Sequence, residues 1–150
     1  MKYLGIDPGF SGAWGMVDHH GSYVACGDMP HDGSTIKTSV MFAEISQARD
    51  GDDLEVCIEA VHAMPKQGVS STFKFGVSYG CMLALADRLN SPTHLVTPQK
   101  WKKDLGLTRD KEDSLRMARL LFPNAPLARK KDNGRAEALL LASYLLEQLS

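Results

Sequence analysis

Tyr3-Leu4-Gly5-Ile6-Asp7-Pro8-Gly9 opens the chain with a short apolar run, a carboxylate and a turn. The apolar run is typical of a buried β-strand, and Pro8-Gly9 would turn the chain back into a second strand. Asp7 would then stand at the end of a rigid strand beside an open turn, where a charged group can be held still and still meet a ligand. Because Asp-Pro-Gly is also an ordinary turn sequence, Asp7 alone does not predict a site.

The segments that follow predict an α/β fold around this first strand. Short runs separated by glycine-rich turns are typical of a three-stranded meander. The nearly continuous apolar runs at 54–59 and 93–96 are typical of buried strands in a sheet covered on both faces. We expect strands at 3–6, 13–17, 22–27, 54–59 and 93–96, and helices at 36–48, 71–89, from 98, 110–122 and 134–148. This order predicts a central mixed five-stranded sheet flanked by helices.

Length and composition fit a single domain over residues 1–150. The hydrophobic fraction is 43%, which is ordinary for a globular protein with a sizeable core. No apolar segment approaches the length of a membrane span, so we expect no membrane partner and, by default, a cytoplasmic address. Cys26, Cys57 and Cys81 are odd in number and widely spaced, which favours free thiols over a disulfide or a zinc site.

The charge of the chain is divided unevenly, although the total is only −1. Residues 1–59 carry three Lys and Arg against ten acids, a net charge of −7, and residues 60–150 carry fourteen against eight, a net charge of +6. Such asymmetry fits a basic face for nucleic acid on an otherwise neutral protein. A solvated surface without a partner explains the charge equally well.

Four carboxylates stand where predicted elements begin or end. Glu59 closes the central strand as Asp7 closes the first, and a buried strand has no structural use for a charge at its tip. Asp132 and Glu137 flank the start of the last helix; because a helix turns by about 100° per residue, both can face one point only if Asp132 precedes the helix. Each acid alone also fits a turn, a cap or a salt bridge. Four converging acids would repel one another without divalent cations between them, so together they predict a two-metal phosphoryl-transfer site.

Several motifs follow one another along nearly the whole chain. They are the turn Ile6-Asp7-Pro8-Gly9, the strand ending in Ile58-Glu59, the polar and basic stretch into a helix, Thr97-Pro98, and the final Gly134-Arg135-Ala136-Glu137-Ala138. Taken in this order, they resemble the RuvC-type Holliday junction resolvases. The segment DNGRAEALLLA at 132–142 is especially similar to the phage and organellar branches of that superfamily.

The resemblance implies an RNase H-like fold and a homodimeric, structure-selective DNA endonuclease. Such an enzyme nicks two symmetric strands of a four-way or other branched DNA and leaves 5′-phosphate and 3′-hydroxyl ends. The resemblance also implies two Mg²⁺ ions per site, with Mn²⁺ as a substitute, bound by Asp7, Glu59, Asp132 and Glu137. Many bacterial members have aspartates three residues apart in the last motif, whereas Gly134 stands three before Glu137 here, which leaves a helix-cap role open for Asp132. The expected compartment is a bacterial or phage-infected cytoplasm, and an organellar origin also fits.

Basic and aromatic residues in the segments around the acids are candidates for holding the DNA. The cations would neutralise backbone phosphates, and His62 or Phe73 would contact an unstacked base. Solvated surface positions and core packing are the competing explanations, and core packing is the stronger one for Trp101. The candidate DNA contacts are His62, Lys66, Phe73, Lys74, Lys100, Lys102, Lys103, Lys111, Lys130, Lys131 and Arg135.

One helix face carries three small residues at intervals of four. Gly76, Gly80 and Ala84 let another element approach closely, and we expect either the dimer contact or tight packing on the helix's own sheet. A homodimer with one active site per protomer would match the two-fold symmetry of a four-way junction.

Other functions remain open from the sequence. The four acids do not specify the sugar, so an RNase H-like nuclease on RNA–DNA hybrids is the nearest rival. An ASKHA-type ATP-binding protein also begins with an Asp-Gly turn between strands, but its nucleotide lies between two domains. A protein that binds branched DNA without cutting it is the third alternative.

Overall fold

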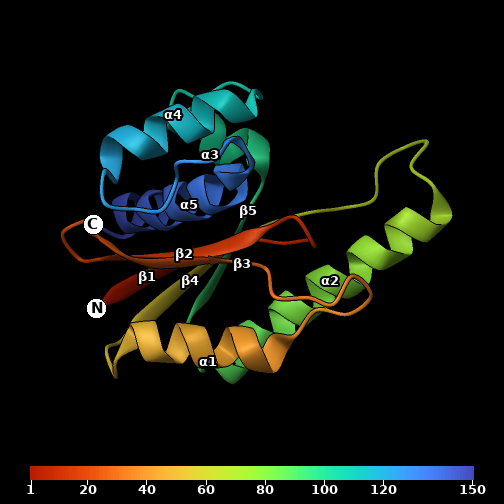
Figure 1. Cartoon of the computed structure of the whole chain (residues 1–150), viewed down its shortest axis with the longest axis horizontal. Coiled ribbons are helices and arrows are strands. Elements are labelled where there is room, and N and C mark those ends of the chain that lie inside the picture. Colours follow the sequence, from red (N-terminus) through yellow and green to blue (C-terminus); the bar gives the residue numbers. More distant parts are fainter.

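The computed structural model describes all residues 1–150 and has a five-stranded sheet between two layers of helices (Figure 1). The strand order is β3-β2-β1-β4-β5, with β1 antiparallel to β2 and parallel to β4. The strands are β1 (Lys2–Asp7), β2 (Ala13–Asp18), β3 (Tyr23–Asp28), β4 (Leu54–Glu59) and β5 (Thr93–Val96). The helices are α1 (Thr38–Arg49), α2 (Val69–Arg88), α3 (Pro98–Asp104), α4 (Lys111–Leu121), the 3₁₀ turn η1 (Lys130–Asp132) and α5 (Asn133–Leu149). The predicted mixed α/β sheet is confirmed.

Helix α5 lies directly on one face of the sheet because glycines in the strands leave room for its backbone. A Cβ atom at Gly5 of β1 would stand 2.0 Å from the Ala138 carbonyl oxygen, and one at Gly15 of β2 would stand 2.7 Å from the Leu139 amide nitrogen. Helices α3 and α4 lie outside α5, and their apolar side chains share its core. The position of α5 across the strands is thus fixed to within an atomic diameter.

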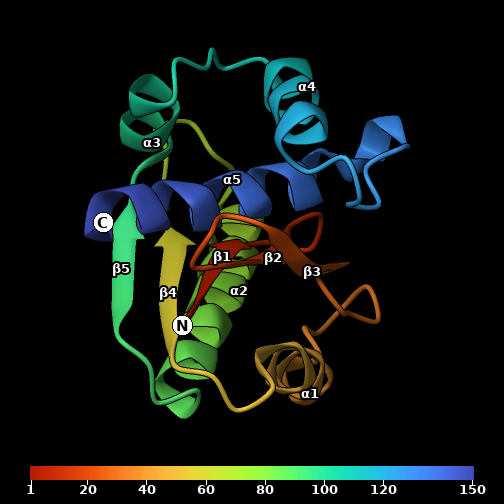
Figure 2. The ribbon, with the colours of Figure 1, turned by 90° about the vertical axis from the view of Figure 1, so that its left-hand side faces the viewer.

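Helices α1 and α2 cover the other face (Figure 2). Met41 and Ile45 of α1 and Met82 and Leu85 of α2 are buried there. The outer half of α2 projects beyond the sheet. None of the helices combines the length and the apolarity that a bilayer crossing requires.

One expectation about packing is wrong, and one of two alternatives is excluded. Strand β5 is the exposed edge of the sheet, because only β4 pairs with it, and Leu95 is 54% exposed rather than buried. The small-residue face of α2 does not pack on its own sheet, because a Cβ atom at Gly76 or Gly80 would meet nothing within 4 Å and Ala84 is exposed. That face of α2 therefore has no partner within the protomer.

Candidate active site

The turn that follows Asp7 is clamped between the N-terminal halves of two helices. Gly12 lets the turn close, because a Cβ atom there would lie 2.0 Å from the Asp7 carbonyl oxygen. Gly134 at the start of α5 touches the turn, since its Cβ would stand 2.9 Å from the Ser11 carbonyl oxygen. From the other side, Phe75 of α2 would be 3.2 Å from a Cβ atom at Gly9. The end of β1 is therefore held rigidly.

Asp7 and Glu59 end adjacent parallel strands, and Glu137 faces them from the first turns of α5. The pairing of Ile6 with Ile58 puts the two strand ends at the same edge of the sheet. The pKa of Asp7 is raised well above its ordinary value, first by burial and then by the charges of Glu59 and Glu137. Burial likewise raises the pKa of Glu59, which is only 9% exposed. The structure thus brings together three of the four predicted acids.

Neighbouring side chains hold two of these carboxylates by direct hydrogen bonds. The Trp101 indole Nε1 donates to Glu59 Oε2 at 2.8 Å, and Trp101 is fully buried. The Glu137 Oε1 atom accepts from Lys102 Nζ at 2.7 Å and from Ser114 Oγ at 3.2 Å. Such bonds fix the orientation of each carboxylate, as expected of a functional site on rigid elements.

The positive charges near Asp7 do not balance the negative charge of the acids around it. The charges of Lys102 and Lys111 act to lower the pKa of Asp7, but burial and the two glutamates outweigh them. No three His, Cys, Asp or Glu side chains stand in a ready-made metal-binding arrangement. The donor set nevertheless fits a hard divalent cation, because it consists of buried oxygens and because added positive charge would favour the charged forms of Asp7 and Glu59.

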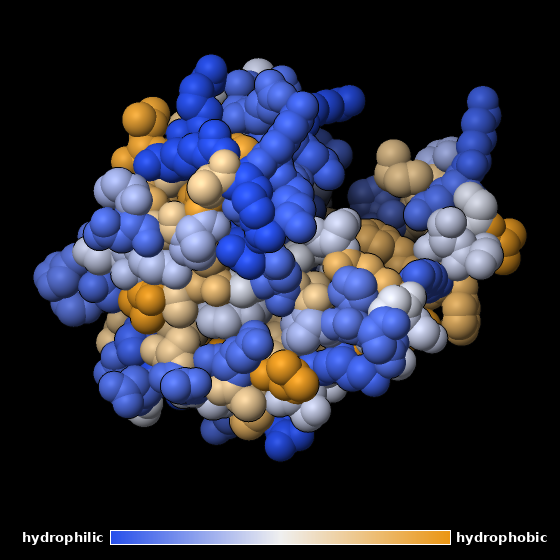
Figure 3. Space-filling model, viewed as in Figure 1, coloured by the Kyte–Doolittle hydropathy of each residue, from blue (hydrophilic) through white to orange (hydrophobic).

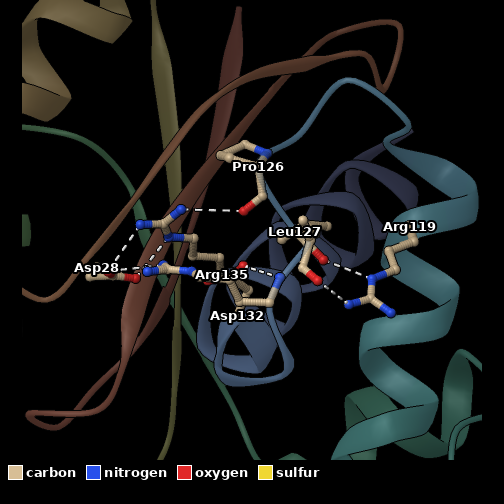
Figure 4. A network of polar contacts seen from close by, with 8 residues as sticks. Asp28, Arg119, Pro126, Leu127, Asp132 and Arg135 are labelled. Atoms are coloured by element: carbon tan, nitrogen blue, oxygen red, sulfur yellow. Dashed lines mark hydrogen bonds and ion pairs between the residues drawn. The ribbon is translucent and has the colours of Figure 1, made fainter.

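Asp132 lies in a different cluster of charges, shown in Figure 4. Its carboxylate is 2% exposed and accepts from the backbone nitrogen of Arg129 at 2.8 Å and from the Arg129 guanidinium at 2.6 Å and 3.0 Å. Burial acts to raise the pKa of Asp132, but the bonds from Arg129 bring it below the ordinary value. Asp132 caps the η1 turn and makes no side-chain cap on α5. The expected cap on the last helix is thus absent, since Asp132 closes the preceding turn instead, and its ligand role stays a prediction.

Arg135, a predicted phosphate contact, belongs to the same cluster. Its guanidinium donates to both oxygens of Asp28, at 2.7 Å and 2.9 Å, and to the Pro126 carbonyl oxygen at 3.2 Å. Arg119 holds the neighbouring loop through the Leu127 carbonyl oxygen at 2.7 Å (Figure 4). These contacts join the end of β3 to the start of α5, so Arg135 has a structural role and three of its five N–H donors are used.

The lysines of the predicted basic segment after Thr97 lie on two different sides of helix α3. The Thr97 hydroxyl accepts from the Lys100 backbone nitrogen, which confirms the predicted cap. Lys102 and Lys103 line an open pocket of about 700 Å³ together with Arg109, a residue that the sequence analysis missed. Lys100 lies outside this pocket and pairs with Asp104 at 2.6 Å.

The remaining predicted DNA contacts are placed as follows. His62 and Lys66 are exposed in the loop between β4 and α2, and Phe73 is 75% exposed on α2. Lys74 lies on α2 with its ammonium 4.2 Å from the centre of the Phe10 ring. Lys130 and Lys131 are exposed in η1, where Lys130 lies 3.6 Å from Glu112.

Known proteins share both the fold and part of the sequence. RuvC of Thermus thermophilus, in a structure described as a complex with Holliday junction substrate, matches 99% of this chain and 96% of its own, with a TM-score of 0.71 and 18% identity. A second Thermus thermophilus RuvC structure matches with the same TM-score and 19% identity. The chain has the RuvC fold.

In sequence, the RuvC-like chain is similar to a plastid protein of an alga. It is 36% identical over 93 residues to the protein named Holliday junction resolvase MOC1, chloroplastic, of Chlamydomonas reinhardtii. The match covers 59% of this chain but only 10% of that relative's length. No protein-family model matches the chain. The predicted resemblance to RuvC-type resolvases with organellar relatives is confirmed in fold and in this stretch of sequence.

The residues that orient the acids are not predictable from local sequence. Trp101 was expected only in the core, and its hydrogen bond to Glu59 spans 42 positions of the chain. Ser114 is a buried hydroxyl on α4 with no motif around it. Both contacts depend on how α3 and α4 pack, which no local pattern records.

Proposed function

We propose that the chain is a single-domain endonuclease that cuts four-way and other branched DNA with the help of Mg²⁺ or Mn²⁺. The observation that carries this proposal is the group of buried acids Asp7, Glu59 and Glu137 on a RuvC fold, in which Asp7 and Glu59 lack sufficient counter-charge. The name of the algal relative supports the choice of junction DNA as substrate. Three free thiols fit a reducing compartment, such as the cytoplasm or an organelle.

The three acids would hold the cations, and Trp101 would keep one Glu59 oxygen occupied so that the other faces the metal. Divalent ions at such a site lower the pKa of a bound water and stabilise the leaving oxygen of a phosphodiester. Lys102 and Lys111, whose charges act on Asp7, stand where they can neutralise the scissile phosphate. Arg129 donates to both oxygens of Asp132, so we assign Asp132 to the structure of the helix entry.

The basic pocket formed by Lys102, Lys103 and Arg109 gives the DNA backbone a path beside the acids. Lys102 belongs both to this pocket and to the acid group, through Glu137, so a strand lying there would pass the proposed metal site. Phosphate contacts of this kind position the substrate without reading its sequence. Structure selectivity would then arise from the dimer that presents two such sites.

The outer face of α2 supports a homodimer. Its apolar side chains have no partner within the protomer, and Figure 3 shows hydrophobic residues on the part of α2 that projects from the body. An isologous contact between two such helices would bury them and place two active sites in one particle. This face consists of Val69, Gly76, Gly80, Leu83 and Ala84.

A substrate panel tests the proposal. End-labelled four-way junction, Y-fork, linear duplex and RNA–DNA hybrid are incubated with the protein and either Mg²⁺ or EDTA. We expect paired symmetric nicks on the junction, with Mg²⁺ only, and little cutting of the linear duplex. Preferential cutting of the hybrid would instead identify a ribonuclease. If the protein binds the junction but does not cut it with either metal ion, it is a non-catalytic binder.

A further inference from the structure

A small cavity lies on the opposite side of the Asp7 turn from the basic pocket. It has a volume of about 190 Å³ and is enclosed by the β1–β2 turn, the segment 34–36 and α2. The lining combines apolar side chains with two hydroxyls and an ammonium. The lining residues are Phe10, Ser34, Thr35, Ile36, Phe73, Lys74, Val77 and Cys81.

The aromatic wall of this cavity is directly connected to the proposed active site. Phe10 follows Asp7 by three residues in the same clamped turn. The His31 ring stacks on Phe10 with centroids 4.9 Å apart and an interplanar angle of 17°. The Lys74 ammonium lies 4.2 Å from the centre of the Phe10 ring and 3.4 Å from the Gly33 carbonyl oxygen.

The loop that carries His31 is held in place before any ligand arrives. The Met29 amide donates to the Gly12 carbonyl oxygen at 3.0 Å, and Met29 is buried. The Lys37 amide donates to the Pro30 carbonyl oxygen at 2.7 Å, and His31 forms a β-bridge with Ile36. The cavity is therefore preformed, as ligand sites usually are.

We propose that this cavity accepts one unpaired base of the DNA strand whose phosphate lies at Asp7. An apolar lining that includes the rings of Phe10 and Phe73 suits the face of any base, and the hydroxyls of Ser34 and Thr35 can bond its edge. Lys74 supplies a positive charge for the attached phosphate, and no carboxylate lines the cavity. Bases leave the stack most easily where paired arms separate, so the cavity would favour branched over linear DNA.

The inference rests on the proposed nuclease function, and its test separates the two. Junctions carry 2-aminopurine, a fluorescent base, at successive positions around the branch point, with Ca²⁺ replacing Mg²⁺ to allow binding without cutting. We expect a fluorescence change at one position only. In Phe10→Leu and Lys74→Gln this change should be lost, and junction cleavage in Mg²⁺ should slow by roughly 5- to 100-fold, the range for losing one stacked base.

Two control variants remove a cation or an aromatic ring at positions outside the cavity. Lys37→Gln removes a cation from the same loop, and Phe42→Leu removes a ring from α1; neither residue lines the cavity, and both variants should behave as the wild type does. Wild-type fluorescence and cleavage in both Phe10→Leu and Lys74→Gln would overturn the inference. A second result would also overturn it. In that result the two variants lose cleavage because a dimer dissociates, as measured by sedimentation, but keep the fluorescence change.

Failure of the nuclease proposal leaves a distinct result. If the wild-type protein cuts no branched DNA, a single-stranded oligonucleotide containing 2-aminopurine tests the cavity alone. The inference then requires a fluorescence change on binding that Phe10→Leu abolishes and Phe42→Leu retains. Equal signals in the two variants would refute it.

Discussion

Two groups of carboxylates stand at the same edge of the sheet and differ in how their charge is balanced. The strand register aligns Asp7, Ala13 and Asp28 across β1, β2 and β3. Asp28 is paired with Arg135, and Asp132 is paired with Arg129 and has a lowered pKa. Asp7 and Glu59 instead have raised pKa values, with burial as the first cause.

The difference separates a structural cluster from a functional one. In the structural cluster, Arg135 bonds Asp28 and Arg129 bonds Asp132. These charge-assisted hydrogen bonds connect β3, the loop before η1 and α5. Acids that are buried together without sufficient counter-charge destabilise the protein unless a cation joins them. Such local instability is typical of active sites, where it is offset by the rest of the fold.

The largest expected effect comes from removing the charge of the undercompensated group. Asp7→Asn should lower junction cleavage by about 10³-fold or more, because the substituted amide binds a divalent cation poorly. Junction binding should stay within about threefold of wild type, since the phosphate contacts are untouched. Single-turnover cleavage and a gel-shift assay measure the two quantities. Full cleavage by Asp7→Asn would remove Asp7 from the mechanism.

The matched change in the balanced cluster should affect stability instead of chemistry. Asp132→Asn should lower the free energy of unfolding by roughly 2–3 kcal/mol, because it breaks charge-assisted bonds to Arg129 at a buried position. Urea unfolding measures this loss. Below the unfolding transition, its cleavage rate should stay within about threefold of wild type. A stable but inactive Asp132→Asn protein would place Asp132 among the ligands and end the distinction between the two clusters.

A smaller effect is expected from the residue that orients Glu59. Trp101→Phe keeps the ring in the core but removes the Nε1 donor, and loss of such an outer contact typically weakens metal binding by roughly 10- to 100-fold. The Mg²⁺ concentration for half-maximal cleavage should rise accordingly, with the rate restored at high Mg²⁺. An unchanged Mg²⁺ dependence would show that the hydrogen bond does not position Glu59.

The smallest effect concerns stability without metal. Because the folded state raises the pKa of Asp7, it binds that proton more tightly than the unfolded chain, and stability falls as pH rises above the ordinary carboxyl range. Asp7→Asn removes this charge, so in EDTA at neutral pH it should raise Tm by a few degrees, about 2–4 °C per kcal/mol. Thermal unfolding from about pH 4 to pH 7 measures the difference. A Tm gap that does not widen with pH would contradict the assignment.

The sequence was sufficient for the elements but not for the partners of each charge. Turn and cap signals such as Asp7-Pro8-Gly9 and Thr97-Pro98 are local, so they predict where strands and helices end. The pairing of Arg129 with Asp132 is also local, but nothing in the sequence distinguishes it from a ligand position. The bond from Trp101 to Glu59 and the exposed edge at β5 follow from tertiary packing alone.

Direct titration of Mn²⁺ or Mg²⁺ into the protein, followed by calorimetry, tests the central claim. The account predicts saturable binding by the wild type and by Asp132→Asn, and strongly weakened binding by Asp7→Asn. Binding lost equally in both variants, or unchanged in Asp7→Asn, would contradict the claim that the undercompensated acids, and not the arginine-balanced ones, form the metal site.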